Sequence, residues 1–199
     1  MTTDRRHALY GLVLAGGLSR RMGRDKALLD NDGRTQLDVA VSLIGAVTDK
    51  QFVSARSAQS GDPGRARYPL IVDRYENLGP VAGILSAMDT HDDVDWLVLA
   101  CDLPNLDRPT LEFLVAHRHT TKPFVAYRSA HDGLPEPLCA IYRRGGDALI
   151  RNFVADGVVC PRKILIRSDT LLLEQPNPRA LDNVNTPEDL AASRLRAVR

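Results

Sequence analysis

An apolar run that ends in two adjacent glycines, with basic residues close behind, most constrains the fold of this chain. The run Tyr10–Leu14 has the length and character of a buried strand, and Gly16 and Gly17 follow it after one residue. Glycines at a strand end let the backbone turn sharply and bring its N–H groups close to an anionic ligand. The segment 18–26 then adds three arginines and a lysine. Fixed amides together with long cationic side chains fit phosphate best, so we predict a phosphate-binding turn after the first strand.

Two common phosphate loops are excluded by the spacing of these residues. A Walker A loop requires G-x-x-x-x-G-K-[ST], but Gly17 and Gly23 lie too far apart and Arg24 stands where the lysine should be. The dinucleotide fingerprint requires G-x-G-x-x-G, and no third glycine falls in register. A glycine turn followed by a solvated basic segment is the plain alternative. The full pattern L-A-G-G-x-S-x-R-M-G-x-D-K specifies too many positions to favour it.

Short apolar runs alternate with longer amphipathic stretches, a pattern typical of a parallel α/β sheet. The expected strands are Tyr10–Leu14, Phe52–Ala55, Leu70–Val72, Trp96–Ala100 and Phe124–Tyr127, with Leu138–Tyr142 and Ile164–Ile166 as later strands, one of which can run antiparallel. The expected helices are Gln36–Val47, Val81–Met88, Leu111–His117, Ala148–Val154 and Leu190–Val198. We therefore predict an α/β fold with a doubly wound, mostly parallel sheet and helices on both faces, in one domain spanning residues 1–199.

The sequence also predicts the structure of two connecting segments. Asn31-Asp32-Gly33 favours a tight reversal of the chain before the first long helix. The segment Ser57–Arg67 is rich in Gly, Ser and Arg, and we expect it to be a mobile surface loop.

The amino-acid composition limits which binding partners and which cellular compartment we expect. Lys plus Arg (26) nearly balances Asp plus Glu (25), so no global field points to nucleic acid or to an anionic membrane. No segment has the apolar length of a membrane helix, and the first residues are too polar for a secretory signal. Cys101, Cys139 and Cys160 are widely spaced, which suits reduced thiols in the cytoplasm. His117 and His119 are expected at a surface rather than in a metal site.

The end of the strand Trp96–Ala100 offers a candidate metal ligand. An apolar strand that runs into Cys101-Asp102-Leu103-Pro104 places one carboxylate at the rim of the sheet, where ligands bind in open α/β folds. Magnesium prefers one or two carboxylates together with phosphate oxygens, so Asp102 opposite the glycine turn would suffice. Capping of the turn before Pro104 is the structural alternative.

The end of the strand Leu70–Val72 offers a second carboxylate. Asp73 could bind a ribose hydroxyl or orient a metal-bound water, or it could pair with Arg74 or cap a turn. Gly79 and Gly83 flank the start of the next helix and leave room for a flat base to approach the backbone. A need for small residues in helix packing remains a rival explanation for both glycines.

A polar segment near the carboxyl end offers two amides. Asn183 and Asn185 alternate in an extended segment, so both could face the same cleft. Thr186 and Pro187 have the character of a helix cap and first helical residue, so a capping role competes with ligand binding.

In this order and at this spacing, these motifs resemble the molybdenum cofactor guanylyltransferase family over nearly the full length of the chain. The motifs are the loop 14–26, Asp73 with Gly79-Pro80-x-x-Gly83, Cys101-Asp102-Leu103-Pro104, and the segment 182–190. The resemblance implies a Rossmann-like nucleotidyltransferase fold. It also implies transfer of GMP from Mg²⁺-GTP to molybdenum-loaded molybdopterin, with release of pyrophosphate.

The resemblance also implies roles for individual residues. The backbone of Leu14, Ala15, Gly16 and Gly17 would contact GTP, and Arg21 and Lys26 would act on its phosphates as catalytic residues. Nucleotide contacts would come from Ser54, Asp73, Gly79, Gly83 and Asp102, with Asp102 also the magnesium ligand, while Asn183 and Asn185 would face the acceptor. Ser54 is a departure, because the family often has an asparagine there. Other molybdenum cofactor biosynthesis proteins and the recipient molybdoenzymes would be the partners.

Related activities remain as alternatives. A CTP-dependent molybdopterin cytidylyltransferase, or a nucleotidyltransferase for another small phosphate, would share the signature loop. The sequence Gly79-Pro80-Val81-Ala82-Gly83 favours GTP, since cytidylyltransferase relatives tend to be serine-rich there. A nucleotide-binding protein without catalysis would not need Arg21, Lys26 and Asp102 together.

Overall fold

The computed structural model describes residues 7–17, 27, 30–31 and 34–182. Its strands are β1 (Leu9–Leu14), β2 (Asp30–Asn31), β3 (Arg34–Thr35), β4 (Lys50–Ala55), β5 (Leu70–Val72), β6 (Asp95–Ala100), β7 (Phe124–Arg128), β8 (Pro135–Tyr142) and β9 (Thr170–Leu173). Its helices are α1 (Gln36–Gly45), α2 (Pro80–Thr90), α3 (Arg108–Ala116), α4 (Asp147–Ala155) and α5 (Pro161–Ile166), with a 3₁₀ turn at Ser57–Gln59.

A seven-stranded sheet forms the centre of the molecule, in the order β5-β4-β1-β6-β8-β7-β9. β8 runs antiparallel to both of its neighbours, and the other strand pairs in the sheet are parallel. The predicted doubly wound, mostly parallel sheet is therefore confirmed. So is the expectation that one of the two later strands runs antiparallel.

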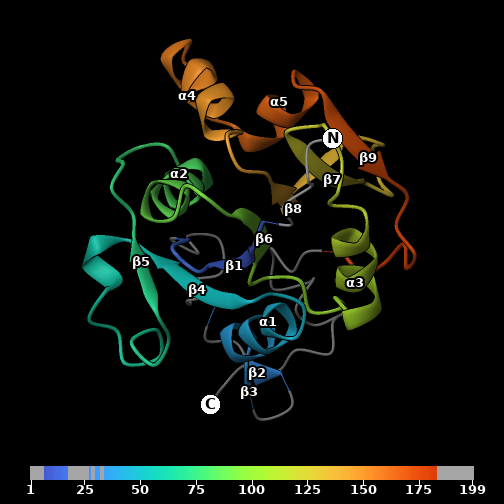
Figure 1. Ribbon diagram of the computed structural model, residues 1–199. Coiled ribbons are helices and arrows are strands. Elements are labelled where there is room, and N and C mark those ends of the chain that lie inside the picture. The colour runs from blue at the N-terminus through green and yellow to red at the C-terminus, as the bar shows by residue number, and fades with distance from the viewer. Residues whose placement is uncertain (1–6, 18–26, 28–29, 32–33, 183–199) are drawn as a thin grey trace.

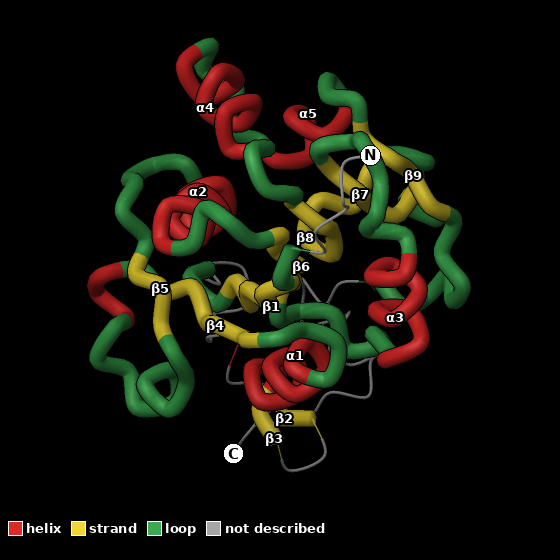
Figure 2. Tube along the Cα trace, in the orientation of Figure 1, coloured by secondary structure: helices red, strands yellow, loops and turns green. Residues whose placement is uncertain are grey.

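Helices cover both faces of this sheet, as Figures 1 and 2 show. On one face, α1 and α3 bury apolar side chains such as Leu37, Ile44 and Leu111 against alternate residues of the central strands. On the other face, α2, α4 and α5 bury a second set that includes Ile84 and Ile150. The alternation of side chains along each strand divides the core in this way, because successive residues point to opposite faces.

The direction of winding reverses at β1, so the switch point of the sheet lies at the carboxyl end of this strand. The chain passes from β1 outward to β4 and β5, then crosses back through α2 to β6 on the other side of β1. Leu14, the last residue of β1, pairs with Ser54 of β4 and with Ala100 of β6. Open α/β sheets bind ligands at such a switch point, beyond the carboxyl ends of the strands.

Local signals explain where two helices begin. Thr35 caps α1 by accepting the Asp38 backbone N–H at 3.1 Å, and the Asp38 carboxylate accepts the Thr35 N–H in return. β2 and β3, on either side of the predicted reversal, pair antiparallel just before this cap. Asp107 caps α3 in the same way, since its carboxylate accepts the N–H of Thr110 at 2.9 Å.

The prediction of a strand at Ile164–Ile166 is wrong. These residues form the second half of α5, where Pro161 occupies the first turn and Ile164 and Leu165 pack against the sheet. A short apolar run fits a buried strand or a buried helix equally well. Pro161 in the first turn favours the helix. The strand at the edge of the sheet beyond β7 is instead β9, which pairs parallel with β7.

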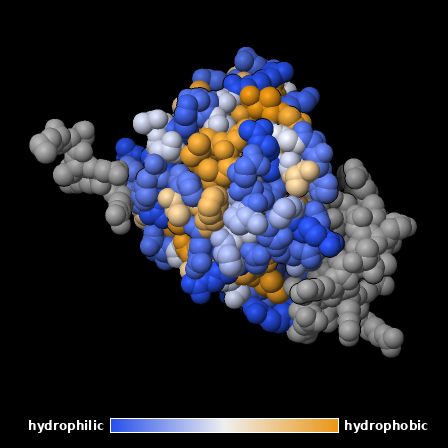
Figure 3. Space-filling model, turned by 90° about the vertical axis from the view of Figure 1, so that its right-hand side faces the viewer, coloured by the Kyte–Doolittle hydropathy of each residue, from blue (hydrophilic) through white to orange (hydrophobic). Residues whose placement is uncertain are grey.

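The edge formed by β9 has a mixed surface. Its residues are all partly exposed, and Figure 3, which faces the side on which β9 and α3 lie in Figure 1, shows apolar side chains among hydrophilic ones. In the described part of the chain, no helix is long and apolar enough to span a membrane.

Candidate active site

The turn after β1 begins with a residue whose backbone is held on both sides. The Ala15 N–H donates to the Ser54 carbonyl at 3.2 Å, which extends the pairing of β1 with β4. The Ala15 carbonyl oxygen accepts two hydrogen bonds from the Arg65 guanidinium, at 3.2 Å from Nε and 2.8 Å from Nη2. Both polar backbone groups of Ala15 are therefore used inside the protein. Among the described residues, the next amides that donate no hydrogen bond are those of the two glycines.

Gly16 brings the turn next to the predicted carboxylate of β5. A Cβ added at Gly16 would lie 3.6 Å from Oδ2 of Asp73 and 3.6 Å from Cγ of Arg56. At Gly17 no atom of the described chain would lie within 4 Å of such a Cβ, so this position is open. Asp73 therefore lies beside the predicted phosphate-binding turn, although more than fifty residues separate them along the chain.

Asp73 is paired with Ser54 rather than with Arg74. The Ser54 hydroxyl donates to Oδ1 of Asp73 at 2.8 Å, and the Asp73 N–H donates to the Ala55 carbonyl at 2.9 Å. Burial raises the pKa of the Asp73 carboxyl, while the Ser54 hydrogen bond and the positive charge of Arg56 oppose that rise. This arrangement leaves Oδ2 of Asp73 facing Gly16 as a hydrogen-bond acceptor.

The two glycines around the start of α2 have structural explanations. Gly79 is the N-cap of α2 with φ of 54° and ψ of −136°, a conformation that side chains disfavour. At Gly83 an added Cβ would lie 2.4 Å from the Ser54 hydroxyl and 2.9 Å from Cδ2 of Leu14. Gly83 thus lets α2 approach the ends of β1 and β4. A nucleotide contact at either glycine remains a prediction.

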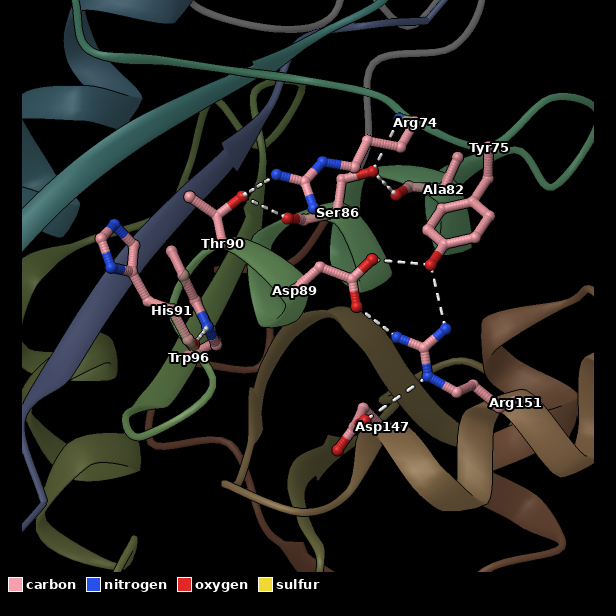
Figure 4. Close-up of polar contacts among 10 residues, drawn as sticks. All are labelled: Arg74, Tyr75, Ala82, Ser86, Asp89, Thr90, His91, Trp96, Asp147 and Arg151. Carbon is pink, nitrogen blue, oxygen red and sulfur yellow. Dashed lines mark hydrogen bonds and ion pairs between the residues drawn. The ribbon is translucent and has the colours of Figure 1, made fainter.

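The segment that follows Asp73 is fixed by polar contacts with α2 and α4 (Figure 4). The Arg74 N–H donates to the Ser86 hydroxyl at 2.8 Å. The Tyr75 hydroxyl donates to Asp89 at 2.6 Å and accepts from Arg151 at 2.9 Å, and Arg151 also pairs with Asp89. These contacts restrict how far Asp73 can move, because they hold the two residues directly after it.

Asp102 lies at the same edge of the sheet, two residues beyond the end of β6. The pairing of Leu14 with Ala100 puts the turn after β1 and the segment Cys101-Asp102 side by side. Asp107 caps α3, so Asp102 is not the cap of this helix. Capping of the turn before Pro104 stays an alternative role for Asp102. A single carboxylate at this edge is a ligand that magnesium accepts together with phosphate oxygens, so a metal site at Asp102 stays a prediction. Among the described residues, no group of three His, Cys, Asp or Glu side chains forms an all-protein metal site.

Two arginines of the site were not predicted from the sequence. Arg56 comes directly after β4, beside Gly16 and Asp73, and its position at a strand end was the available signal. Arg65 gave no such signal, because it lies in the segment Ser57–Arg67 that we expected to be a surface loop. The prediction of a surface loop is wrong at this residue, since Arg65 is only 1% exposed.

Several predicted site residues cannot be placed. Arg21, Lys26, Asn183 and Asn185 lie outside the described residues, so their roles remain predictions. The residue just before Asn183 is described: the Asp182 carboxylate lies 3.0 Å from Nε2 of His131 in the connection between β7 and β8.

The chain is similar to proteins of one family over most of its length. The MobA-like NTP transferase domain matches residues 11–170. A molybdenum cofactor biosynthesis bifunctional protein of Synechocystis is 38% identical over 91% of this chain, which spans about half (52%) of that protein's length. A probable molybdenum cofactor guanylyltransferase of Mycobacterium avium is 34% identical, with 92% of this chain and 94% of that protein covered.

A solved structure shares the same fold. The crystal structure of molybdopterin-guanine dinucleotide biosynthesis protein A from Archaeoglobus fulgidus superposes with a TM-score of 0.76. It is 21% identical and covers 92% of this chain and 95% of its own. The expected nucleotidyltransferase fold is therefore confirmed.

Proposed function

Since the chain belongs to the MobA-like NTP transferase family, we propose that it transfers GMP from GTP to molybdenum-loaded molybdopterin, forming molybdopterin guanine dinucleotide and releasing pyrophosphate. The family assignment makes it a nucleotidyltransferase. The observation that carries the proposal is the meeting of the glycine turn with Asp73 on one side and the Asp102 segment on the other. The names of relatives that align over nearly their full length support GTP and molybdopterin as substrates.

The charges around the turn suggest the direction in which the nucleotide lies. A phosphate next to Oδ2 of Asp73 would be repelled, whereas a ribose hydroxyl or a base amino group could donate to it. The nucleoside would therefore occupy the Asp73 side of the turn. The triphosphate would extend past Gly17, which is open, toward the basic segment 18–26.

Magnesium is the proposed cofactor, and Asp102 is the residue that would hold it together with phosphate oxygens. When bound, the ion would neutralise negative charge on the phosphates. Asp73 would serve the nucleoside, because its carboxylate is already engaged by Ser54 and faces Gly16.

The reaction follows from these positions. A terminal phosphate oxygen of the acceptor attacks the α-phosphorus of GTP, a new P–O bond forms, and the bond from the α-phosphorus to the bridging oxygen of pyrophosphate breaks. Negative charge grows on the departing pyrophosphate, and the amides of Gly16 and Gly17 with Arg21 and Lys26 would stabilise it. A phosphate nucleophile is ionised at neutral pH, so no residue is required as a general base.

The acceptor would lie on the side of the carboxyl-terminal segment. Asn183 and Asn185 are proposed to face it, and the contact of Asp182 with His131 ties the start of this segment to the connection between β7 and β8. Recipient molybdoenzymes and other cofactor biosynthesis proteins are the proposed partners. A cytoplasmic location is proposed too, because the three cysteines are widely spaced in the sequence, which suits reduced thiols.

The test is direct. Protein is incubated with magnesium, molybdenum-loaded molybdopterin and either GTP or CTP, and the products are identified by mass spectrometry. We expect molybdopterin guanine dinucleotide and pyrophosphate with GTP alone. A cytosine dinucleotide would identify a cytidylyltransferase, and tight GTP binding without any pyrophosphate would identify a nucleotide-binding protein that does not catalyse transfer.

A further inference from the structure

Arg65 is a buried arginine whose guanidinium is directed at the backbone of the glycine turn. It is 1% exposed, while arginine is rarely buried without a dedicated partner. Two of its N–H groups converge on one acceptor, the Ala15 carbonyl, at 3.2 and 2.8 Å. A charged side chain in such a position is costly to bury, so the contact must do more than fill space.

The loop around Arg65 holds the guanidinium in this direction. Oδ1 of Asp62 accepts the Arg65 backbone N–H at 3.0 Å and lies 3.3 Å from its Nη1. The backbone N–H groups of Arg65 and Ala66 also donate to the Asp62 carbonyl, at 3.1 and 2.9 Å. Asp62 therefore fixes both the loop and the side chain, and little conformational freedom is left to lose when a ligand binds.

The hydrogen bonds to Ala15 also determine the direction of the next amide. The peptide unit that joins Ala15 to Gly16 is planar and trans, so its carbonyl and its N–H point in opposite directions. Because Arg65 holds the carbonyl, the Gly16 N–H must point away from Arg65. Within the described part of the chain, this N–H donates no hydrogen bond, so it is available to a ligand.

We propose that Arg65 is a positioning residue, which turns the Gly16 N–H toward the triphosphate of the bound nucleotide and keeps it there. The inference rests on the proposed function, because it takes GTP as the nucleotide. Arg65 itself does not touch the ligand; it acts through one peptide unit, and its buried positive charge adds to the attraction for phosphate.

An arginine is better suited to this role than a lysine. The planar guanidinium presents two N–H groups to one oxygen in a fixed geometry, while a lysine ammonium is a point charge on a flexible chain. Arg65→Lys would therefore keep the charge but lose the directional control of the peptide. Arg65→Met would remove both.

The test compares ligands with and without phosphates. Binding of Mg²⁺-GTP and of guanosine is measured by calorimetry, with competition for the weaker ligand, in the parent protein and in Arg65→Lys and Arg65→Met. The control is Arg67→Met, since Arg67 is exposed in the same loop and pairs with Asp38 on α1. We expect Arg65→Met to weaken GTP binding about tenfold to a hundredfold, as for a lost hydrogen bond to a charged group, and to leave guanosine binding within about twofold.

Arg65→Lys should recover only part of the GTP affinity, and Arg67→Met should match the parent. Equal losses for GTP and guanosine, or no loss for either, would overturn the inference. If Arg65→Met does not fold, binding of GTP and of guanosine is compared in Arg65→Lys and Asp62→Asn instead. Failure of the proposed function would appear differently, as a parent protein that does not bind GTP or does not release pyrophosphate.

Discussion

The Ser54 hydroxyl donates a 2.8 Å hydrogen bond to Oδ1 of Asp73, which joins the ends of β4 and β5 beside the glycine turn. Ser54 is 1% exposed in this structure. Its hydroxyl is therefore committed to the neighbouring carboxylate. In the proposed nucleotide site Ser54 would act by holding Asp73, whose other carboxylate oxygen faces Gly16.

Ser54→Ala should change the pH dependence of nucleotide binding. Burial already raises the pKa of Asp73, and the lost hydrogen bond would raise this pKa further. Only the ionised carboxylate accepts hydrogen bonds through both oxygens, so GTP affinity should fall at a higher pH during acidification than in the parent. Titration calorimetry from neutral to acidic pH measures this. Identical pH profiles for the two proteins would contradict the assignment of Asp73 as a nucleotide ligand.

Asp73→Asn should separate stability from binding. Because the pKa of Asp73 is raised in the native state, the native protein holds this proton more tightly than the unfolded chain. The side chain therefore supports stability at low pH and loses that contribution as pH rises through the native pKa. Asp73→Asn should melt at the parent temperature or above it at neutral pH, and should bind GTP weakly. A melting temperature well below that of the parent at neutral pH would show that the carboxylate is mainly structural.

Gly83→Ala should destabilise the protein through a clash at the ends of β1 and β4. The added methyl would lie 2.4 Å from the Ser54 hydroxyl and 2.9 Å from Leu14, and both side chains sit in a packed region. Overpacking of this kind costs about 1–3 kcal/mol. Gly61→Ala is the matched control, since no described atom would contact its methyl. Chemical denaturation should show a lower unfolding free energy for Gly83→Ala and an unchanged one for Gly61→Ala.

Tyr75→Phe tests the network that holds the segment after Asp73. Removing the hydroxyl leaves Asp89 and Arg151 paired but removes its hydrogen bonds to both, at a cost of about 1 kcal/mol in unfolding free energy. We expect KM for GTP to rise, while kcat changes less. Arg128→Met provides a control, because the ion pair of Arg128 with Glu174 is exposed and contributes little. Unchanged KM in Tyr75→Phe would mean that Asp73 is positioned by Ser54 alone.

Much of the parallel part of the sheet could be predicted, because strands such as β5 and β6 are apolar runs followed by a turn and a helical pattern. The sequence does not predict β9, and it wrongly predicts a strand at Ile164–Ile166. The reason is that a short apolar run has no periodicity that distinguishes a strand from a helix. The contact of Ser54 with Asp73 depends on how β4 and β5 pair, which local sequence does not encode. The burial of Arg65 depends on the Ala15 carbonyl fifty residues away.

Asp102→Asn is the sharpest test of the catalytic proposal. An amide keeps the shape of the side chain but not its charge, so the fold should be retained while magnesium binding weakens. Loss of one well-placed electrostatic contact slows turnover about a hundredfold to a thousandfold. Asp93→Asn, an exposed site before the amino end of β6, serves as control. Pyrophosphate release is measured across a magnesium titration, and the activity of Asp102→Asn should recover partly at high magnesium. Turnover equal to that of Asp93→Asn at every magnesium concentration would remove Asp102 from the metal site and leave the basic segment 18–26 to carry the charge of the phosphates.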